Sequence, residues 1–235
     1  MTVLLPMDER SSHIACIGII MDGNRRWAKE SNLPSYEGHA RGYAKLKDVV
    51  RWAREAGIPH IAIYAFSTEN WQRSEQEVDY LMKLFRFLLE NEIDEMIQER
   101  IRMRIIGNRA RFSEDMRQLM ENIEAATSTS YDITLHLALS YGGRAEIVSA
   151  VNALLEKGVS SVTEEAFART LGSHPMPDPD LIIRTGGEKR LSNFLPWQST
   201  YSELFFTDTK WPAFEKEEFK SILAEFSSRE RRHGK

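Results

Sequence analysis

Two stretches of the sequence combine charged residues and glycines directly after short apolar runs. In the first, Asp22 is followed by Gly23, Asn24, Arg25 and Arg26. A carboxylate at this position could hold a hard cation such as Mg²⁺, and the amides of a glycine turn at a helix start can bind an anion. The alternative is an ordinary strand-to-helix turn with solvated arginines. The segment matches neither a Walker loop nor a dinucleotide-binding fingerprint.

The second stretch, residues 184–192, places Arg184, Arg190 and Ser192 around a pair of glycines. Guanidinium groups bind phosphate oxygens in pairs, and glycines let the backbone approach them closely. Because Arg184 directly extends an apolar run, we favour a phosphate site over a polar surface loop with a Gly-Gly turn.

A third group of polar side chains follows the apolar run at residues 58–66. Ser67, Asn70 and Arg73 crowd the end of this run, and Trp71 beside them suits simple packing as well as a site. Two diphosphate groups held side by side would explain why several arginine-bearing segments occur in one chain.

Three further residues have both a structural and a functional interpretation. His39 is a lone histidine, and such residues are commonly structural. Glu77 suits the first turn of a helix, where acidic side chains are stabilising, and Glu203 suits a strand edge. Each of them could instead contact a ligand or a metal ion.

The elements that position these residues alternate between short apolar and longer amphipathic segments. Strands are expected at residues 14–20, 58–66, 101–106, 133–139, 181–183 and 204–206. Helices are expected at residues 41–56, 77–99, 114–126, 144–156, 164–171 and 217–229. Apolar strands separated by helices are typical of a buried parallel sheet with helices on both faces.

We therefore predict an α/β fold with a single open, mostly parallel six-stranded sheet flanked by helices. Ligands bind such sheets beyond the carboxyl ends of the strands. The polar residues described above follow these ends, so they should gather at one edge of the sheet.

Bulk composition narrows the class of protein further. The chain has 235 residues, of which 42% are hydrophobic, and a net charge of -4, which gives no reason to expect nucleic-acid binding. We expect an N-terminal arm at residues 1–12 and one domain at 13–235. A single cysteine and no secretory signal segment favour the cytoplasm. No apolar run approaches the ~20 residues of a membrane span, so a lipid ligand would require only peripheral membrane contact.

The helix expected at residues 77–99 is apolar around most of its circumference. A surface helix needs an apolar arc of only about 100°. The excess predicts either a helix buried against a neighbour or a dimer partner, or the wall of a tunnel for a hydrocarbon chain.

These motifs together resemble the cis-prenyltransferases, most closely the bacterial undecaprenyl diphosphate synthases, from about residue 13 to residue 234. The resemblance rests on residues 13–27 with Ile20-Met21-Asp22-Gly23-Asn24, Gly38-His39 with Gly42, residues 66–71 with Arg73 and Glu77, residues 141–144, residues 184–188 with Arg190 and Ser192, and residues 197–203 with Trp211-Pro212. The Asp-rich DDxxD motifs of the trans-acting prenyltransferases are absent from the sequence.

The resemblance implies a role for each motif. It implies Mg²⁺ as cofactor, with Asp22 as the catalytic aspartate and Glu203 helping to place the metal. The implied cradle for the allylic diphosphate consists of Gly23, Asn24, Arg26, His39 and Arg73, and the implied isopentenyl diphosphate site consists of Arg184, Arg190 and Ser192. Arg25 and Trp27 are also expected to bind substrate. The residues that position the reacting ends are Ser67 and Asn70, taken as catalytic, with Trp71 and Glu77. The tunnel is expected between sheet and helices, lined by Ala65, Leu81, Phe85, Leu88 and Leu137.

The implied reaction joins isopentenyl diphosphate to an allylic diphosphate, geranyl or farnesyl diphosphate, and releases diphosphate. The resemblance also implies a homodimer in which Arg232-His233-Gly234 reaches the partner's active site. Two other functions stay open. A magnesium-dependent phosphohydrolase would usually carry a second acid where Asn24 stands, and a non-catalytic partner subunit would usually lack Asp22.

One position departs from the family pattern. Ser35 stands four residues before His39, where the family often has arginine. A charge-assisted hydrogen bond is worth ~1.5–3 kcal/mol, so this change bears on the affinity for the allylic primer and on its identity. Product length and a head-to-middle condensation on the same scaffold also stay open.

Overall fold

The structure is a computed structural model that describes residues 14–229 of the chain. The arm expected at residues 1–12 and the Arg232-His233-Gly234 motif lie outside the described residues. Among residues 14–229, no helix combines the length and the apolar character that crossing a membrane would require.

Six strands form one open sheet in the order β3-β4-β2-β1-β5-β6, and all five strand pairs are parallel. The prediction of a six-stranded parallel sheet is therefore confirmed. The strands are β1 Cys16–Ile20, β2 His60–Ser67, β3 Ile101–Ile106, β4 Ile133–Tyr141, β5 Leu181–Arg184 and β6 Glu203–Phe206.

Eight α-helices connect or flank the strands within the described residues: α1 Asn24–Glu30, α2 Ser35–Glu55, α3 Glu75–Asn91, α4 Ile93–Gln98, α5 Glu114–Ala126, α6 Gly143–Glu156, α7 Glu164–Ala168 and α8 Lys216–Ser228. The short 3-10 helix Thr68–Gln72 follows β2. α2 begins six residues before the expected start at residue 41, directly after Pro34, whose φ of -60° is already suitable for a helix start.

The prediction of one continuous helix at residues 77–99 is wrong. The helix breaks at Glu92, where the backbone leaves helical geometry with φ -102° and ψ 1°. Just before the break, the Asn91 side chain donates to the carbonyl of Phe87 at 2.9 Å and caps the end of α3. The Glu92 carboxylate accepts a hydrogen bond from Lys47 of α2 at 3.0 Å. These contacts end α3 and turn α4 toward the amino edge of the sheet.

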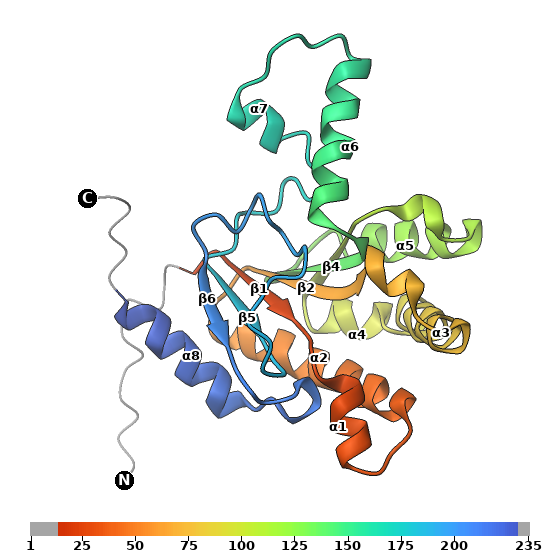
Figure 1. The fold of residues 1–235 in the computed structure, drawn as a ribbon, viewed down its shortest axis with the longest axis vertical. Helices are drawn as coiled ribbons and strands as arrows, with labels where there is room; N and C mark the ends of the chain where they lie inside the picture. The colour runs from red at the N-terminus through yellow and green to blue at the C-terminus, as the bar shows by residue number, and fades with distance from the viewer. Residues whose placement is uncertain (1–13, 230–235) are drawn as a thin grey trace.

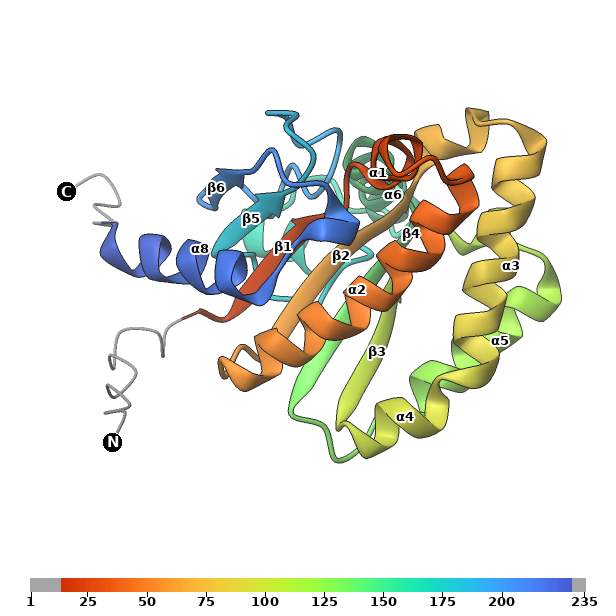
Figure 2. The same ribbon diagram turned by 90° about the horizontal axis from the view of Figure 1, so that it is seen from below.

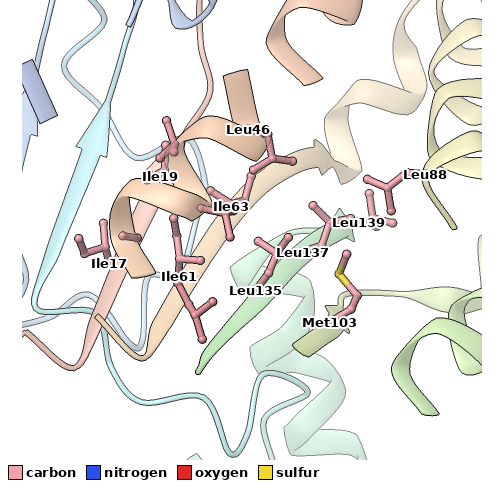
Figure 3. Packing of buried hydrophobic residues seen from close by; sticks show 14 of the residues in the cluster. Ile17, Ile19, Leu46, Ile61, Ile63, Leu88, Met103, Leu135, Leu137 and Leu139 are labelled. Atoms are coloured by element: carbon pink, nitrogen blue, oxygen red, sulfur yellow. The ribbon is translucent and has the colours of Figure 1, made fainter. Parts of the chain in front are cut away.

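One face of the sheet packs against helices. Its buried cluster joins the strands to α2, α3, α4, α5 and α8. Figure 2 shows α2 running along this face and α3 standing farther out beside α5, and Figure 3 shows Ile17, Ile61 and Ile63 packing in the cluster. Alternate residues of each strand point to this face, because side chains along a strand alternate between the two faces.

The other face is covered differently. Its buried cluster combines strand residues with Met176, Phe194 and Leu195 from the loops around β5, and it contains no residue of a described helix. The Tyr64 ring stacks on Phe194 at 4.7 Å. The expectation of helices on both faces therefore holds for one face, whereas loops form most of the cover on the other. α6 leads away from the sheet, with α7 beside its outer end (Figure 1).

Candidate active site at the carboxyl edge of the sheet

Asp22 follows β1 at the carboxyl edge of the sheet, and its carboxylate has three partners. Oδ2 accepts from Nη2 of Arg184 at 2.9 Å. Oδ1 accepts from the backbone amide of Gly23 at 2.6 Å and lies 3.1 Å from Nη2 of Arg26. Two arginines that are distant in sequence thus meet on one carboxylate, as the strand-end argument predicts.

These contacts keep Asp22 ionised. Burial alone would raise the pKa of Asp22, but hydrogen bonds and charge from Arg184 and Arg26 outweigh it and hold the pKa below its usual value. Thr185 fixes the backbone of Asp22. The Asp22 amide donates to the Thr185 hydroxyl at 3.1 Å, and this hydroxyl donates to the Asp22 carbonyl at 2.8 Å.

Arg184 ends β5 and is only 4% exposed. Nη1 donates to the Ser192 hydroxyl at 2.8 Å and to the carbonyl of Arg190. Nε is buried and finds no partner among the described residues. A buried donor without a partner is costly. The side chain is therefore held in place by its loop and by Asp22.

The loop that carries Ser192 has an unusual backbone. Ser192 and Asn193 adopt φ of 49° and 69°, in the left-handed region that non-glycine residues rarely occupy. Asn193 holds this loop to the 3-10 helix Thr68–Gln72 and to α6, because its Nδ2 donates to Glu69 at 3.1 Å and its Oδ1 accepts from the amide of Arg144 at 2.9 Å. Such conformations cluster at ligand sites, where the surrounding structure maintains them.

Two glycines one turn apart on α2 let the start of α1 approach closely. A Cβ on Gly38 would lie 2.2 Å from the carbonyl oxygen of Asn24, and one on Gly42 would lie 2.3 Å from Asn24 Oδ1. Both distances are too short for any side chain. Asn24 is thus held against α2, and its Oδ1 is buried without a hydrogen-bond partner among residues 14–229.

A second cluster of basic side chains surrounds Glu77 at the start of α3. Glu77 Oε1 accepts from Arg73 at 2.9 Å and lies 3.3 Å from Nε2 of His39, while Oε2 accepts from Arg25 at 3.4 Å. Burial and the charge of Arg73 lower the pKa of His39 although Glu77 opposes them. Glu77 therefore positions two arginines and a histidine and is not simply a helix-start acid.

Ser67 and Asn70 shape the end of β2. The Ser67 amide donates to Asn70 Oδ1 at 3.1 Å, and the Ser67 side chain caps the 3-10 helix in return. Trp71 Nε1 donates to the hydroxyl of Ser140 at 3.0 Å, and the Trp71 ring packs edge-on against Phe66. Trp71 accordingly serves packing in this structure.

A cleft of about 590 Å³ opens beside these groups. Its polar wall contains Asp22, Asn24, His39, Ser67, Asn70, Arg73, Arg184 and Ser192. Its apolar wall contains all five residues expected to line a tunnel, namely Ala65, Leu81, Phe85, Leu88 and Leu137. The cleft therefore joins a charged end at the sheet edge to an apolar interior between the sheet, α2 and α3.

Some expected site residues lie outside the cleft lining. Glu203 is the first residue of β6 and pairs with Leu181, the first residue of β5, so it lies at the amino edge, away from Asp22. Its carboxylate binds Arg229 at 2.6 Å. Arg190 is largely exposed and pairs with Glu188, and Trp27 is half-buried on α1. The structure thus does not bring Glu203 to Asp22 within one chain.

Several residues at the site do not appear among the sequence expectations. Thr185 positions Asp22, and Tyr43, Tyr64 and Asn193 line the cleft. Thr185 and Asn193 each adjoin an expected site residue, which is a usable signal. Tyr43 lies one helical turn after His39, and that spacing could have indicated a place on the same helix face.

The donor set at the sheet edge suits one kind of metal binding. No group of three His, Cys, Asp or Glu side chains within residues 14–229 could hold a metal without help. Mg²⁺, however, is commonly bound through one or two carboxylates together with substrate phosphates and water. The ionised Asp22 in a basic surrounding fits this mode, because a diphosphate would supply the remaining oxygen ligands.

The site combines a carboxylate and arginines at the carboxyl edge of a parallel sheet with an apolar cleft beside them. Residues 20–234 match the family model described as "Putative undecaprenyl diphosphate synthase". The chain belongs to this family, which is a family of prenyltransferases.

Individual proteins show the same likeness. The chain is 45% identical to an isoprenyl transferase of Chromobacterium violaceum, over 93% of this chain and 87% of that one. It is also 45% identical to an isoprenyl transferase of Thermotoga maritima, over 93% and 95%.

Two solved structures resemble the fold. Lavandulyl diphosphate synthase from Lavandula x intermedia, in complex with dimethylallyl diphosphate, has a TM-score of 0.90 at 32% identity and covers 97% of this chain and 100% of its own. A probable undecaprenyl diphosphate synthase from Campylobacter jejuni has a TM-score of 0.81 at 33% identity, with 95% and 99% coverage.

Proposed function

We propose that this protein is a Mg²⁺-dependent cis-prenyltransferase that joins isopentenyl diphosphate to an allylic diphosphate and releases diphosphate. The observation that carries the proposal is the Asp22–Arg184 pair at the head of a cleft with an apolar interior. A phosphate-binding edge and an apolar cavity in one hollow suit a substrate with a charged head and a hydrocarbon tail.

The proposed mechanism assigns two diphosphate sites. Asn24, Arg26, His39 and Arg73 hold the allylic diphosphate, and Arg184, Arg190 and Ser192 hold isopentenyl diphosphate. Mg²⁺, when bound with Asp22, would neutralise charge that develops on the departing diphosphate.

The side chains supply the rest of the stabilisation. Arginine donors that are already in place favour the departure of the allylic diphosphate, because they are aimed where negative charge grows. The double bond of isopentenyl diphosphate attacks the allylic carbon, the carbon–oxygen bond to diphosphate breaks, and a proton is lost to give a new double bond. Apolar walls such as Leu81 and Leu137 keep water from the allylic cation.

We propose geranyl or farnesyl diphosphate as the primer. Leu84 and Leu88, one helical turn apart on α3, both belong to the apolar lining, and this continuous apolar wall supports a primer longer than one isoprene unit. The lavender enzyme binds dimethylallyl diphosphate, a shorter allylic compound. Ser35, the first residue of α2, is exposed, so the guanidinium that the family often has at this position is missing from the primer site.

The experiment that tests the proposal uses purified protein with labelled isopentenyl diphosphate, Mg²⁺, and in turn dimethylallyl, geranyl and farnesyl diphosphate. We expect Mg²⁺-dependent incorporation into longer chains, with geranyl or farnesyl diphosphate preferred. No incorporation with any primer, from folded protein, would contradict the proposed activity.

We expect bulkier side chains in the apolar wall to shorten the product. Leu81→Trp and Leu137→Phe would each fill part of the cleft that both residues line. The measurement is the distribution of product lengths by chromatography. Phe87→Trp is the matched control, because Phe87 is on α3 but 50% exposed and outside the cleft lining. Unchanged products from both cleft variants would remove these residues from the proposed tunnel.

We also propose a homodimer formed through α6. Val148, Val151 and Leu155 are 58%, 41% and 64% exposed, and their spacing places them on one face of this helix. We expect the wild type to be dimeric and Val151→Asp to shift it toward monomer, because a buried charge without a partner is costly. Light scattering after size exclusion measures the change, with Phe87→Asp as control. A monomeric wild type would contradict the proposal.

The expected cytoplasmic location and peripheral membrane contact stay predictions. The role of Glu203 in metal binding also stays a prediction. Because Glu203 and Asp22 lie at opposite edges of the sheet, these two carboxylates of one chain would not bind the same metal ion.

A further inference from the structure

The cleft has a smaller neighbour. A second cavity of about 40 Å³ lies between α2, α4 and strands β3 and β4. Three residues line both hollows, namely Tyr43 and Leu46 of α2 and Leu88 of α3. These three side chains therefore form a partition between the two cavities.

The second cavity lies beyond the cleft in the direction of the amino edge of the sheet. On β4, Leu137 lines the cleft and Leu135 lines the second cavity. Two residues along a strand span about 6.6 Å, and side chains two apart share a face. Figure 3 shows Leu135 and Leu137 in sequence along β4, with Leu46 on the α2 side and Leu88 on the α3 side. The second cavity thus lies farther from the charged edge of the sheet.

Residues along α2 show the same sequence of charged end, partition and second cavity. His39 lies at the charged end, Tyr43 at the partition and Lys47 in the lining of the second cavity. These residues are four apart, so they stack on one helix face at a rise of about 6 Å per step. Sheet and helix therefore agree on an axis that runs from the diphosphate end through the partition.

An ion cluster closes the far end. Lys47 Nζ lies 3.0 Å from Glu92 and 2.5 Å from Glu95, and both carboxylates line the second cavity. The break between α3 and α4 places Glu92 at this point. Contact with charged groups does not stabilise a hydrocarbon chain, so this ion cluster marks the end of the apolar path.

Tyr43 is the polar member of the partition. Its hydroxyl is buried and makes no hydrogen bond of good geometry with a described residue. Burial, the Glu92 carboxylate beside the hydroxyl and the charge of Glu95 raise the pKa of Tyr43, so the side chain stays neutral. A bulky, neutral ring across the axis of the cleft suits a physical stop.

We propose that Tyr43 determines product length in this chain, by stopping the growing hydrocarbon before the second cavity. This inference rests on the proposed prenyltransferase function. When Tyr43 is shortened, the two cavities join, and the chain grows until it meets the Lys47 cluster.

The test compares the main product length of the wild type with that of Tyr43→Ala, Tyr43→Phe and Tyr43→Ala/Leu135→Phe, with one primer and excess isopentenyl diphosphate. We expect Tyr43→Ala to lengthen the main product by at least one isoprene unit. Tyr43→Phe keeps the ring and should keep the wild-type length. The double variant refills the second cavity and should restore the shorter product.

The outcomes distinguish failure of the proposed prenyltransferase function from failure of the proposed role of Tyr43. Wild-type protein without any elongated product would overturn the proposed function and this inference with it. Elongation by the wild type with the same length from folded Tyr43→Ala would overturn the role of Tyr43 alone. Lengthening that persists in the double variant would overturn the second cavity as the added space. Tyr43→Leu, which keeps an apolar side chain, carries the same test if Tyr43→Ala does not fold.

Discussion

Replacement of Asp22 by alanine is expected to lower kcat by at least about 10²-fold, the loss typical of removing one preorganised stabilising group. The carboxylate is the negative group between Arg184 and Arg26, and the proposed Mg²⁺ position depends on it. The measurement is steady-state incorporation of labelled isopentenyl diphosphate with saturating primer and Mg²⁺. Near wild-type turnover would refute the assignment of Asp22.

A matched control separates chemistry from stability. Asp132 forms an ion pair with Arg100 at 2.8 Å and directly precedes β4, at the opposite edge of the sheet. Asp132→Ala therefore also removes a carboxylate from an arginine, but it should retain wild-type turnover. Thermal unfolding of both variants shows whether either loses its fold. Equal losses of activity in both would indicate a general structural effect.

The second large effect is expected from Arg184→Lys. A lysine cannot reproduce the hydrogen bonds that the guanidinium makes to Asp22 and Ser192 together. Hydrogen bonds to charged groups contribute ~1.5–3 kcal/mol each, so we expect kcat/KM for isopentenyl diphosphate to fall about 10- to 10²-fold or more. The KM for the primer should change less.

Arg190→Lys is the comparison for this result. Arg190 is exposed, and its side chain forms an ion pair with Glu188, so its replacement leaves the Asp22 contacts intact. We expect a rise in KM for isopentenyl diphosphate with little change in kcat. An Arg184→Lys variant with wild-type kcat and KM would show that the buried guanidinium does not contribute to the site.

Much of the fold follows from local sequence pattern. The six apolar runs predict the strands, since residues buried on both faces need no polar alternation. The break at Glu92 could not be predicted in this way, because it depends on Lys47, which lies 45 residues earlier in the chain. The packing of the loop around Phe194 on the other face of the sheet could not be predicted either, because irregular segments have no hydrophobic periodicity.

Some residues of the candidate site could likewise be predicted from the sequence, and others could not. Asp22 follows β1, and Arg184 and Ser67 are the last residues of β5 and β2, so the geometry of a parallel sheet brings them to the same edge. Glu203 shows the limit of this argument, because the start of a strand lies at the other edge. Tyr43 became significant only through the cavities on both of its sides, which a helical pattern cannot reveal.

The identity of the released phosphorus compound distinguishes prenyl transfer from phosphate hydrolysis. Phosphorus NMR of the wild type with isopentenyl diphosphate, farnesyl diphosphate and Mg²⁺ would identify the product as it forms. We expect inorganic diphosphate, one molecule for each isopentenyl unit incorporated, and none without the primer. Release of orthophosphate without chain growth would contradict the account and indicate a phosphohydrolase.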